Sequence, residues 1–202
     1  MADTTTTDEQ ALIRAAQRGD RNAFNLLVLR YQDGLYTLAY RIMGETQSAA
    51  DAAQEAFITA FRRLSTYRGG SFRGWLIRIA TNICYDELRR RKRRPVVAME
   101  DLVPPESDDD APIPDPSDTP EQAMQQRELN RAIQDCINAL GEDQRVVLIL
   151  SDVEGLSYQE IADNTNAQVG TVKSRLSRAR ASVRNCLQAV EELLPGAYRL
   201  ME

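Results

Sequence analysis

Bases and aromatic residues are mixed between residues 61 and 94. This segment holds eleven arginines and lysines against two acids, and Tyr67, Phe72, Trp75 and Tyr85 lie among them. Basic side chains attract phosphates, and aromatic rings stack on unpaired bases at about 1–3 kcal/mol per base. Each ring could instead pack in a core, and for Trp75 the two interpretations weigh equally. As a group, the mixture favours binding of single-stranded nucleic acid.

A second pattern begins at Ser157, with the sequence SYQEIADNTNAQVGTVKSRLSRARASV. It fits a helix-turn-helix, because Ala162 supplies the small residue where two helices cross and Asn166 tolerates the left-handed turn. The apolar residues that would lock the helices together are Ile161, Val169, Val172 and Leu176. Five bases and no acid lie between Lys173 and Arg184. This segment therefore predicts a reader of duplex DNA.

Several classes of protein are excluded by composition. The chain has no histidine, which removes the usual general base near neutral pH and any Ser/His or Cys/His pair. There is no phosphate-binding GxxxxGK[ST] motif and no cluster with metal-ligand spacing. We expect no enzyme, no catalytic residue, no metal and no cofactor. The cysteines Cys84, Cys136 and Cys186 lie far apart and are predicted to be small buried thiols in a reducing compartment.

The elements that must position these residues are predicted to be helices throughout. A short helix is expected to start near Thr7, in a capping box, and to stop at Gly19. Asp20 should cap a long helix that ends at Gly44.

Ser48 and Asp51 should cap a third helix. Its apolar stripe is predicted to be Ala53, Phe57, Ala60, Phe61 and Leu64. After a loop over residues 67–74, a further helix should run from Trp75 to Arg94, and helices should return from Pro120 to Leu194.

The segment between these helical parts has a different composition. Seven of the eight prolines lie between residues 95 and 120, together with a run of acids and no base. Such a composition predicts a flexible linker. The expected fold class is all-α, with two small helical domains at 1–94 and 119–194, an acidic proline-rich linker at 95–118 and a tail at 195–202.

Two basic surfaces on separate domains suggest contact with two positions on DNA. A repressor needs only the duplex reader, whereas promoter opening needs both the duplex reader and a surface for melted strand. Four motifs in order, AFNLLVLRYQ, DAAQEAFITAFRRLSTYRG, SFRGWLIRIATN and LSYQEIADNTNAQVGTVKSRLSRAR, cover most of the chain. They resemble the bacterial sigma-70 family, in its extracytoplasmic-function group. That group retains two folded domains, regions 2 and 4.

The resemblance implies roles for particular residues. The third helix would bind the clamp coiled coil of the polymerase β′ subunit through Asp51, Gln54 and Glu55. The loop and helix after it would recognise the −10 element and hold a flipped base, with Arg73, Trp75, Arg78, Asn82, Asp86 and Arg89 as the expected contacts. The recognition helix would read the −35 element with Lys173, Ser174, Arg175, Ser177 and Arg178.

The resemblance also implies partners. These are core RNA polymerase, through the β′ clamp coiled coil and the β flap, promoter DNA, and a cognate anti-sigma factor, often membrane-tethered in the family. No small-molecule substrate is expected. No apolar run approaches the roughly 18 residues of a membrane span and no signal peptide is visible, so we expect a cytoplasmic protein. An anti-sigma factor could hold it at the inner face of the membrane.

Two alternatives stay open. The chain could be a stand-alone helix-turn-helix regulator, although nothing in it resembles a dimerisation helix. The linker acids could form a solvated spacer, or they could lie in the basic cleft and RNA-exit channel of the polymerase, as the resemblance favours. The tail EELLPGAYRLME receives no role.

Overall fold

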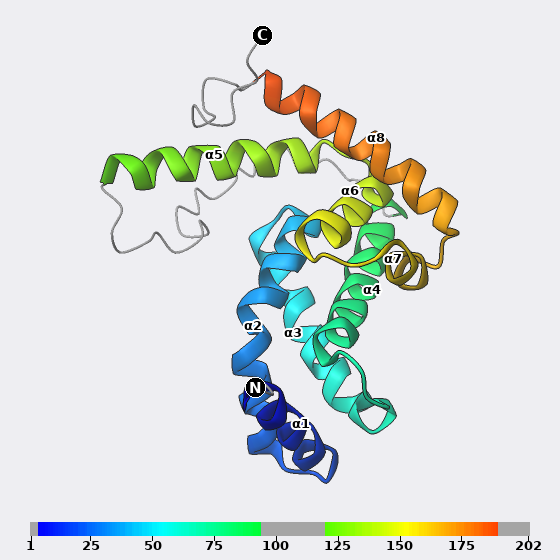
Figure 1. Ribbon diagram of the computed structural model, residues 1–202. Helices are drawn as coiled ribbons and strands as arrows, with labels where there is room; N and C mark the ends of the chain where they lie inside the picture. Colours follow the sequence, from blue (N-terminus) through cyan, green and yellow to red (C-terminus); the bar gives the residue numbers. More distant parts are fainter. Residues whose placement is uncertain (1–3, 94–119, 190–202) are drawn as a thin grey trace. The chain divides into compact units, whose positions relative to one another are not determined.

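A computed structural model describes residues 4–93 and 120–189, which form helices and contain no strand (Figure 1). The chain divides into two compact units, Met1–Arg89 and Arg90–Glu202. The all-α class is confirmed. No helix in the described parts is long and apolar enough to cross a membrane. The predicted linker and tail lie outside the described residues.

The first unit is built from α1 (Thr4–Gln17), α2 (Arg21–Met43), α3 (Thr46–Arg63), the 3-10 turn η1 (Leu64–Thr66) and α4 (Phe72–Arg93). α2 packs against both α1 and α3. The predicted ends of α2 are confirmed. Asp20 accepts hydrogen bonds from the backbone N–H groups of Asn22 and Ala23, and Gly44 closes the helix in a left-handed conformation.

Two predicted helix starts are wrong. α1 begins at Thr4 rather than near Thr7, because threonine is only mildly unfavourable in a helix and a capping pattern does not oblige the helix to start there. α3 begins at Thr46, after Glu45. Ser48 is buried inside its first turn and donates to the Glu45 carboxylate at 2.8 Å, so neither Ser48 nor Asp51 caps it.

The apolar stripe of α3 also differs from the prediction. Ala53, Ala60 and Leu64 are buried as expected, whereas Phe61 is 42% exposed. The remaining buried positions of the helix are Ser48 and three alanines, Ala49, Ala52 and Ala56. Small side chains let the backbone of α2 approach closely, and Phe61 instead lies against Phe24 of α2 at 4.9 Å between ring centroids.

α4 begins at Phe72, three residues before its predicted start. The hydroxyl of Ser71 accepts a hydrogen bond from the backbone N–H of Gly74 at 3.0 Å, which caps the helix. The loop between η1 and α4 is therefore shorter than predicted, at residues 67–71, and we call it the 67–71 loop. Gly69 and Gly70 in this loop have φ of +106° and +91°, which only glycine adopts readily.

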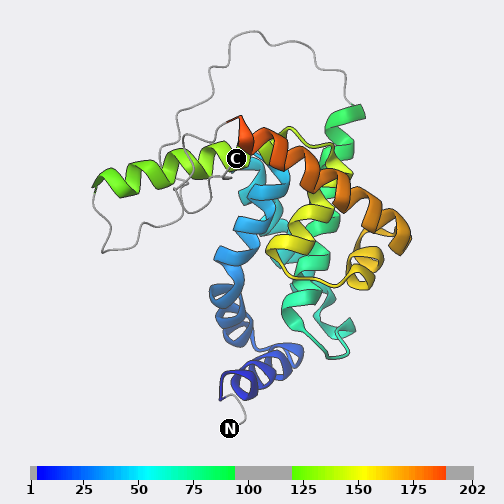
Figure 2. The same ribbon diagram turned by 45° about the horizontal axis from the view of Figure 1, so that its top comes forward.

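The second unit contains α5 (Pro120–Asn138), α6 (Glu142–Leu148), the π-helical turn η2 (Ile149–Val153), α7 (Tyr158–Thr165) and α8 (Val169–Gln188). α5, α6 and α7 each pack against α8, and Figure 2 gives a second view of these helices. α8 ends at Gln188, and the predicted continuation to Leu194 lies outside the described residues.

The helix-turn-helix is confirmed as α7 and α8. Ser157 and Glu160 form a reciprocal capping box at the start of α7. Ala162 is buried, and Asn166 has φ of 51° at the turn, as its side-chain type predicted. Ile161, Val172 and Leu176 are buried between the helices, whereas Val169 is only half-buried.

The prediction of three separate thiols is wrong. Cys136 of α5 and Cys186 of α8 form a disulfide, with their Cα atoms 5.7 Å apart. The packing of α5 against α8 brings together residues 50 positions apart, which no local sequence pattern shows. Cys84 is the free cysteine, and its complete burial raises the pKa of its thiol to about 12.

Candidate nucleic-acid interface

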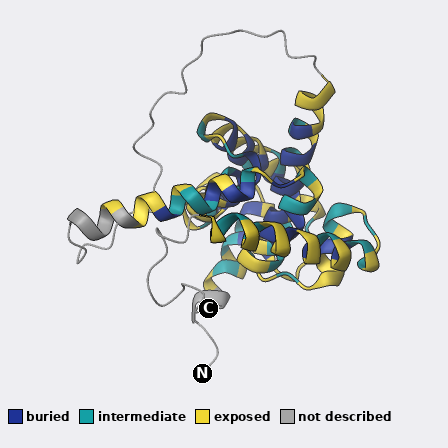
Figure 3. Ribbon diagram, turned by 90° about the horizontal axis from the view of Figure 1, so that it is seen from above, coloured by how far each residue is buried: buried dark blue, intermediate teal, exposed yellow. Residues whose placement is uncertain are grey.

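α4 separates a buried face from an exposed polar one, as the alternation of dark blue and yellow in Figure 3 shows. Arg78, Asn82, Asp86 and Arg89 are exposed, and their spacing of three or four residues puts them on one side of the helix. This polar face extends over about 21 Å from Trp75 to Arg89. The opposite side is buried, with Leu76, Ile77, Ala80, Thr81, Cys84 and Leu88.

Arg73 is not on this face. It is exposed, but two residues before Trp75 it projects from nearly the opposite side of the helix. There it lies near Tyr31, whose pKa is raised by burial and by Glu9, with the positive charge of Arg73 opposing this rise. The structure therefore brings together five of the six predicted −10 contacts and separates Arg73 from them.

The four aromatic residues do not share one role. Phe72 is 1% exposed and Tyr85 is 6% exposed, so both belong to the core and neither can stack on a base. Trp75 is half-buried, with its ring 5.3 Å from Tyr67 and 5.5 Å from Phe72. Tyr67 is also partly exposed, and its hydroxyl donates to the Gly70 carbonyl at 2.7 Å. Tyr67 and Trp75 thus form the accessible edge of an aromatic cluster.

Tyr85 has a second function in this face. The guanidinium of Arg89 lies over its ring, 5.4 Å from the centroid. Such a cation–π contact orients the arginine without removing its charge. Tyr85, a core aromatic residue, therefore positions the exposed guanidinium of Arg89 at the far end of the polar face.

The three polar residues of α3 lie together on its surface. Asp51, Gln54 and Glu55 are all exposed. Asp51 accepts from the Gln47 amide at 3.2 Å, and Glu55 accepts from the Thr59 hydroxyl at 3.4 Å. These are weak interactions along one helix, which leave both carboxylates accessible to a partner. The predicted acidic surface is therefore present as one patch.

The exposed face of α8 is smaller than the sequence predicted. Lys173, Ser174, Ser177 and Arg178 are exposed on it. Arg175 instead lies at the edge of the buried face and forms an ion pair with Asp143 of α6 at 2.5 Å. The structure therefore brings together four of the five predicted −35 contacts, and the fifth, Arg175, is partly exposed and held by an acid of its own unit.

A second basic side chain of α8, that of Arg180, is also paired with an acid. Arg180 forms two hydrogen bonds with Asp152 of η2, at 2.6 and 2.9 Å. This arginine holds the pKa of the Asp152 carboxyl below its usual range. The sequence separations of 32 for Arg175–Asp143 and 28 for Arg180–Asp152 hide both acids from an analysis of the helix alone.

The comparisons with known proteins agree with this geometry. Residues 27–94 match the family model described as Sigma-70 region 2, and residues 130–183 match that described as Sigma-70, region 4. The RNA polymerase sigma-H factor of Pseudomonas aeruginosa is 43% identical over 188 residues, which cover 91% of this chain and 96% of that protein. The ECF RNA polymerase sigma-E factor of Escherichia coli K12 is 39% identical over 181 residues, covering 89% and 94%.

A solved structure is similar as well. The sigma factor RpoE in complex with the anti-sigma factor NepR, from Bartonella quintana, gives a TM-score of 0.61 at 25% identity, covering 81% of this chain and 96% of that one. The chain therefore belongs to the extracytoplasmic-function group of the sigma-70 family, whose members are promoter-specificity subunits of bacterial RNA polymerase.

Proposed function

We propose that the two units divide the work of promoter recognition, with region 2 in residues 1–94 and region 4 in residues 119–194. Region 2 binds polymerase and the −10 element, and region 4 binds the −35 element. The observation that carries this proposal is the exposed polar face on α4 and on α8, each backed by a buried apolar face that fixes its orientation.

The acidic patch of α3 is assigned to polymerase docking. Asp51, Gln54 and Glu55 would pair with basic or polar groups of the β′ clamp coiled coil. Their exposure and their place on one side of a helix support this role. Region 4 would contact the β flap in the same holoenzyme. Both contacts are typical of the family.

The polar face of α4 is assigned to the −10 element. Trp75 and Tyr67 would provide the stacking surface for an unpaired base, while Arg78 and Asn82 would provide charge and hydrogen bonds. Asp86 would add a polar contact, and Arg89 would bind phosphate. Arg73 would contribute only to the electrostatic attraction of DNA.

The exposed face of α8 is assigned to the −35 element. Arg178 and Lys173 can donate to guanine edges in the major groove, and Ser174 and Ser177 can bond to bases or phosphates. Arg175, held by Asp143, would act mainly by keeping α8 in place on α6.

Two further parts of the proposal concern regulation and location. A cognate anti-sigma factor would cover these surfaces and release them under stress, since the similar Bartonella quintana protein was solved with an anti-sigma factor. The chain would act in the cytoplasm, or at the inner face of the membrane while its anti-sigma factor is anchored there.

Run-off transcription with core RNA polymerase tests the proposal. Core enzyme plus this chain should yield transcripts from selected promoters, whereas the chain alone should bind the same duplexes weakly. The double variant Trp75→Ala/Arg178→Ala should bind core polymerase but initiate poorly. Failure to produce a transcript from any promoter of the source genome would refute the proposal.

A further inference from the structure

The last residue of α1 reaches the loop in front of α4. The side-chain amide of Gln17 donates to the carbonyl of Leu64 at 3.0 Å and to the carbonyl of Tyr67 at 3.1 Å. These acceptors lie 47 and 50 residues later in the chain. One side chain therefore joins the N-terminal helix to both sides of the 3-10 turn η1, where the 67–71 loop begins.

The 67–71 loop has little else to hold its backbone. A Cβ atom added at Gly69 or Gly70 would meet nothing within 4 Å, so packing does not restrain this part of the loop. Its internal restraints are the bond from the Tyr67 N–H to the Leu64 carbonyl at 3.2 Å, the Tyr67 hydroxyl bond to the Gly70 carbonyl and the Ser71 cap on α4. Because glycine has more backbone freedom than any other residue, the loop depends on such anchors for a single conformation.

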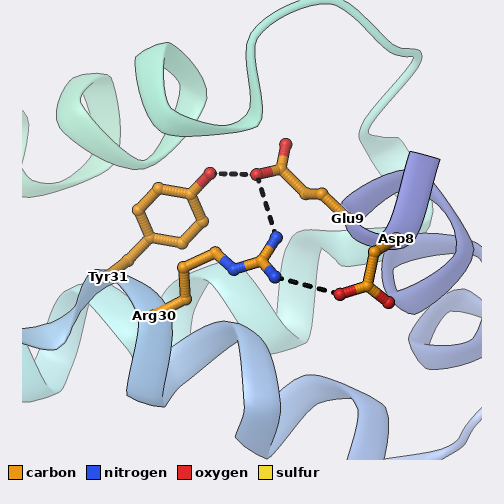
Figure 4. A network of polar contacts seen from close by, with 4 residues as sticks. All are labelled: Asp8, Glu9, Arg30 and Tyr31. Carbon is orange, nitrogen blue, oxygen red and sulfur yellow. Dashed lines mark hydrogen bonds and ion pairs between the residues drawn. The ribbon is translucent and has the colours of Figure 1, made fainter. Parts of the chain in front are cut away.

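The helix that carries Gln17, α1, is itself held against α2 by polar contacts. Figure 4 shows Asp8 and Glu9 of α1 meeting Arg30 and Tyr31 of α2. Arg30 pairs with Asp8 at 3.1 Å and with Glu9 at 3.7 Å, and the Tyr31 hydroxyl donates to Glu9.

The same network reaches the first residue of α4. The Tyr31 ring lies 5.8 Å from that of Phe72, which begins α4. α1 is thus tied to α2 at its start, and through Tyr31 to the aromatic cluster beside the loop.

We propose that Gln17 is a positioning residue for −10 recognition, acting on the 67–71 loop without touching DNA. One of its hydrogen bonds holds the backbone carbonyl of Tyr67 and the other holds that of Leu64, and the Tyr67 ring packs against Trp75. The inference rests on the proposed −10 role of Tyr67 and Trp75, and it adds a residue that lies before residues 27–94, the part of the chain that matches the region 2 family model. Without Gln17, DNA binding would have to order the loop, and this ordering opposes binding.

The variants follow from the geometry. Gln17→Leu removes the donors and keeps a similar volume at an exposed position. Gln17→Glu keeps the shape and the solubility but replaces the donor amide with acceptors that face two carbonyls. Gln10→Leu is the matched control, because Gln10 is an exposed glutamine of the same helix.

Two measurements are needed. The first is the affinity of each holoenzyme for a fluorescein-labelled single strand carrying the −10 sequence of a promoter that the wild type transcribes, relative to a scrambled strand. Both Gln17 variants should lose about fivefold of this preference, the effect expected for two exposed hydrogen bonds. The second is the emission of Trp75, the single tryptophan, in the full chain without polymerase. Both Gln17 variants should shift it, and Gln10→Leu should not.

The outcomes separate the possible failures. If the Gln17 variants keep the wild-type preference, the positioning role is wrong. If the preference falls only together with thermal stability and core-polymerase affinity, Gln17 is merely structural, and the inference is also wrong. If wild-type holoenzyme itself does not distinguish the two strands, the proposed −10 role fails first and this inference falls with it.

Discussion

At the scale of single residues, equal charge in the sequence does not mean equal availability. Arg175 and Arg178 lie three positions apart on α8, yet Arg175 is bound to Asp143 and Arg178 is exposed. The difference arises because Arg175 projects at the edge of the buried face, where α6 supplies an acid. A charge on this helix is therefore available to a partner only where no acid of a neighbouring helix holds it.

Arg178→Ala should weaken binding to −35 duplex by the holoenzyme by about 1–3 kcal/mol, because one base or phosphate contact is lost. Core-polymerase affinity should be unchanged. Arg175→Ala is the matched control. Because it removes the ion pair with Asp143, it should lower the thermal stability of the second unit. Filter binding and thermal melts check both variants. An equal loss of polymerase affinity in Arg178→Ala would identify it as a folding residue.

The Asp152–Arg180 pair gives a prediction about pH. Because the pKa of Asp152 is depressed in the folded state, the pair stabilises the fold above the ordinary carboxyl pKa of about 4. That stabilisation disappears as pH falls through the folded pKa. Asp152→Asn should lower the free energy of unfolding at pH 7 by less than about 1 kcal/mol, since the pair is exposed.

Urea unfolding at several pH values measures this effect. The wild type and Asp152→Asn should differ at pH 7, and the difference should shrink steadily as the pH falls below about 4, whereas Asp135→Asn, at an exposed position of α5, should match the wild type throughout. A difference between wild type and Asp152→Asn that did not shrink at all below about pH 4 would show that the pair is not the cause.

At the scale of elements, helix type was more predictable than helix limits. Asp20, Gly44 and Asn166 act locally, through their own side chain or backbone, and the ends that they mark are confirmed. α1, α3 and α4 each start at least three residues before the predicted position, because several residues could cap each helix. The disulfide was missed because it joins α5 to α8 across 50 residues.

The α3 surface gives a prediction for one helix. Glu55→Arg should reduce affinity for the β′ clamp coiled coil by reversing a charge in the acidic patch. The fold should be unaffected, because Glu55 is exposed. Pull-down with a β′ coiled-coil fragment and circular dichroism check the two statements. A loss of helicity that accompanied the loss of binding would contradict the assignment.

Reduction of the Cys136–Cys186 disulfide should destabilise the second unit. Closing a loop of this length is worth about 2–4 kcal/mol through the unfolded state. Dithiothreitol should therefore lower the urea midpoint of the wild-type second unit by the corresponding amount. The Cys136→Ala/Cys186→Ala variant should be insensitive to dithiothreitol. Sensitivity in that variant would contradict the assignment, because its one remaining cysteine, Cys84, has no other cysteine in the chain with which to form a disulfide.

At the scale of the whole molecule, the role of the acidic residues between the two units remains a prediction, because these residues lie outside the described part of the chain. Changing Asp108, Asp109 and Asp110 to asparagine tests whether this segment enters the polymerase. If it occupies a basic channel until the transcript displaces it, the ratio of abortive to full-length transcripts should change. A solvated spacer predicts an unchanged ratio in the same gel assay.

The sequence by itself determined the fold class, the helix-turn-helix, the order of the motifs and the family. These features depend on residue types at short spacings. The side chains on one face of a helix recur every three or four residues, so a short stretch of sequence is enough to show them. Only the tertiary structure decided which of the predicted contacts are available. Arg175 and Arg180 are held by acids of other elements, Phe72 and Tyr85 belong to the core, and Gln17 reaches the loop. Each of these outcomes depends on packing between distant segments, which local sequence patterns do not specify.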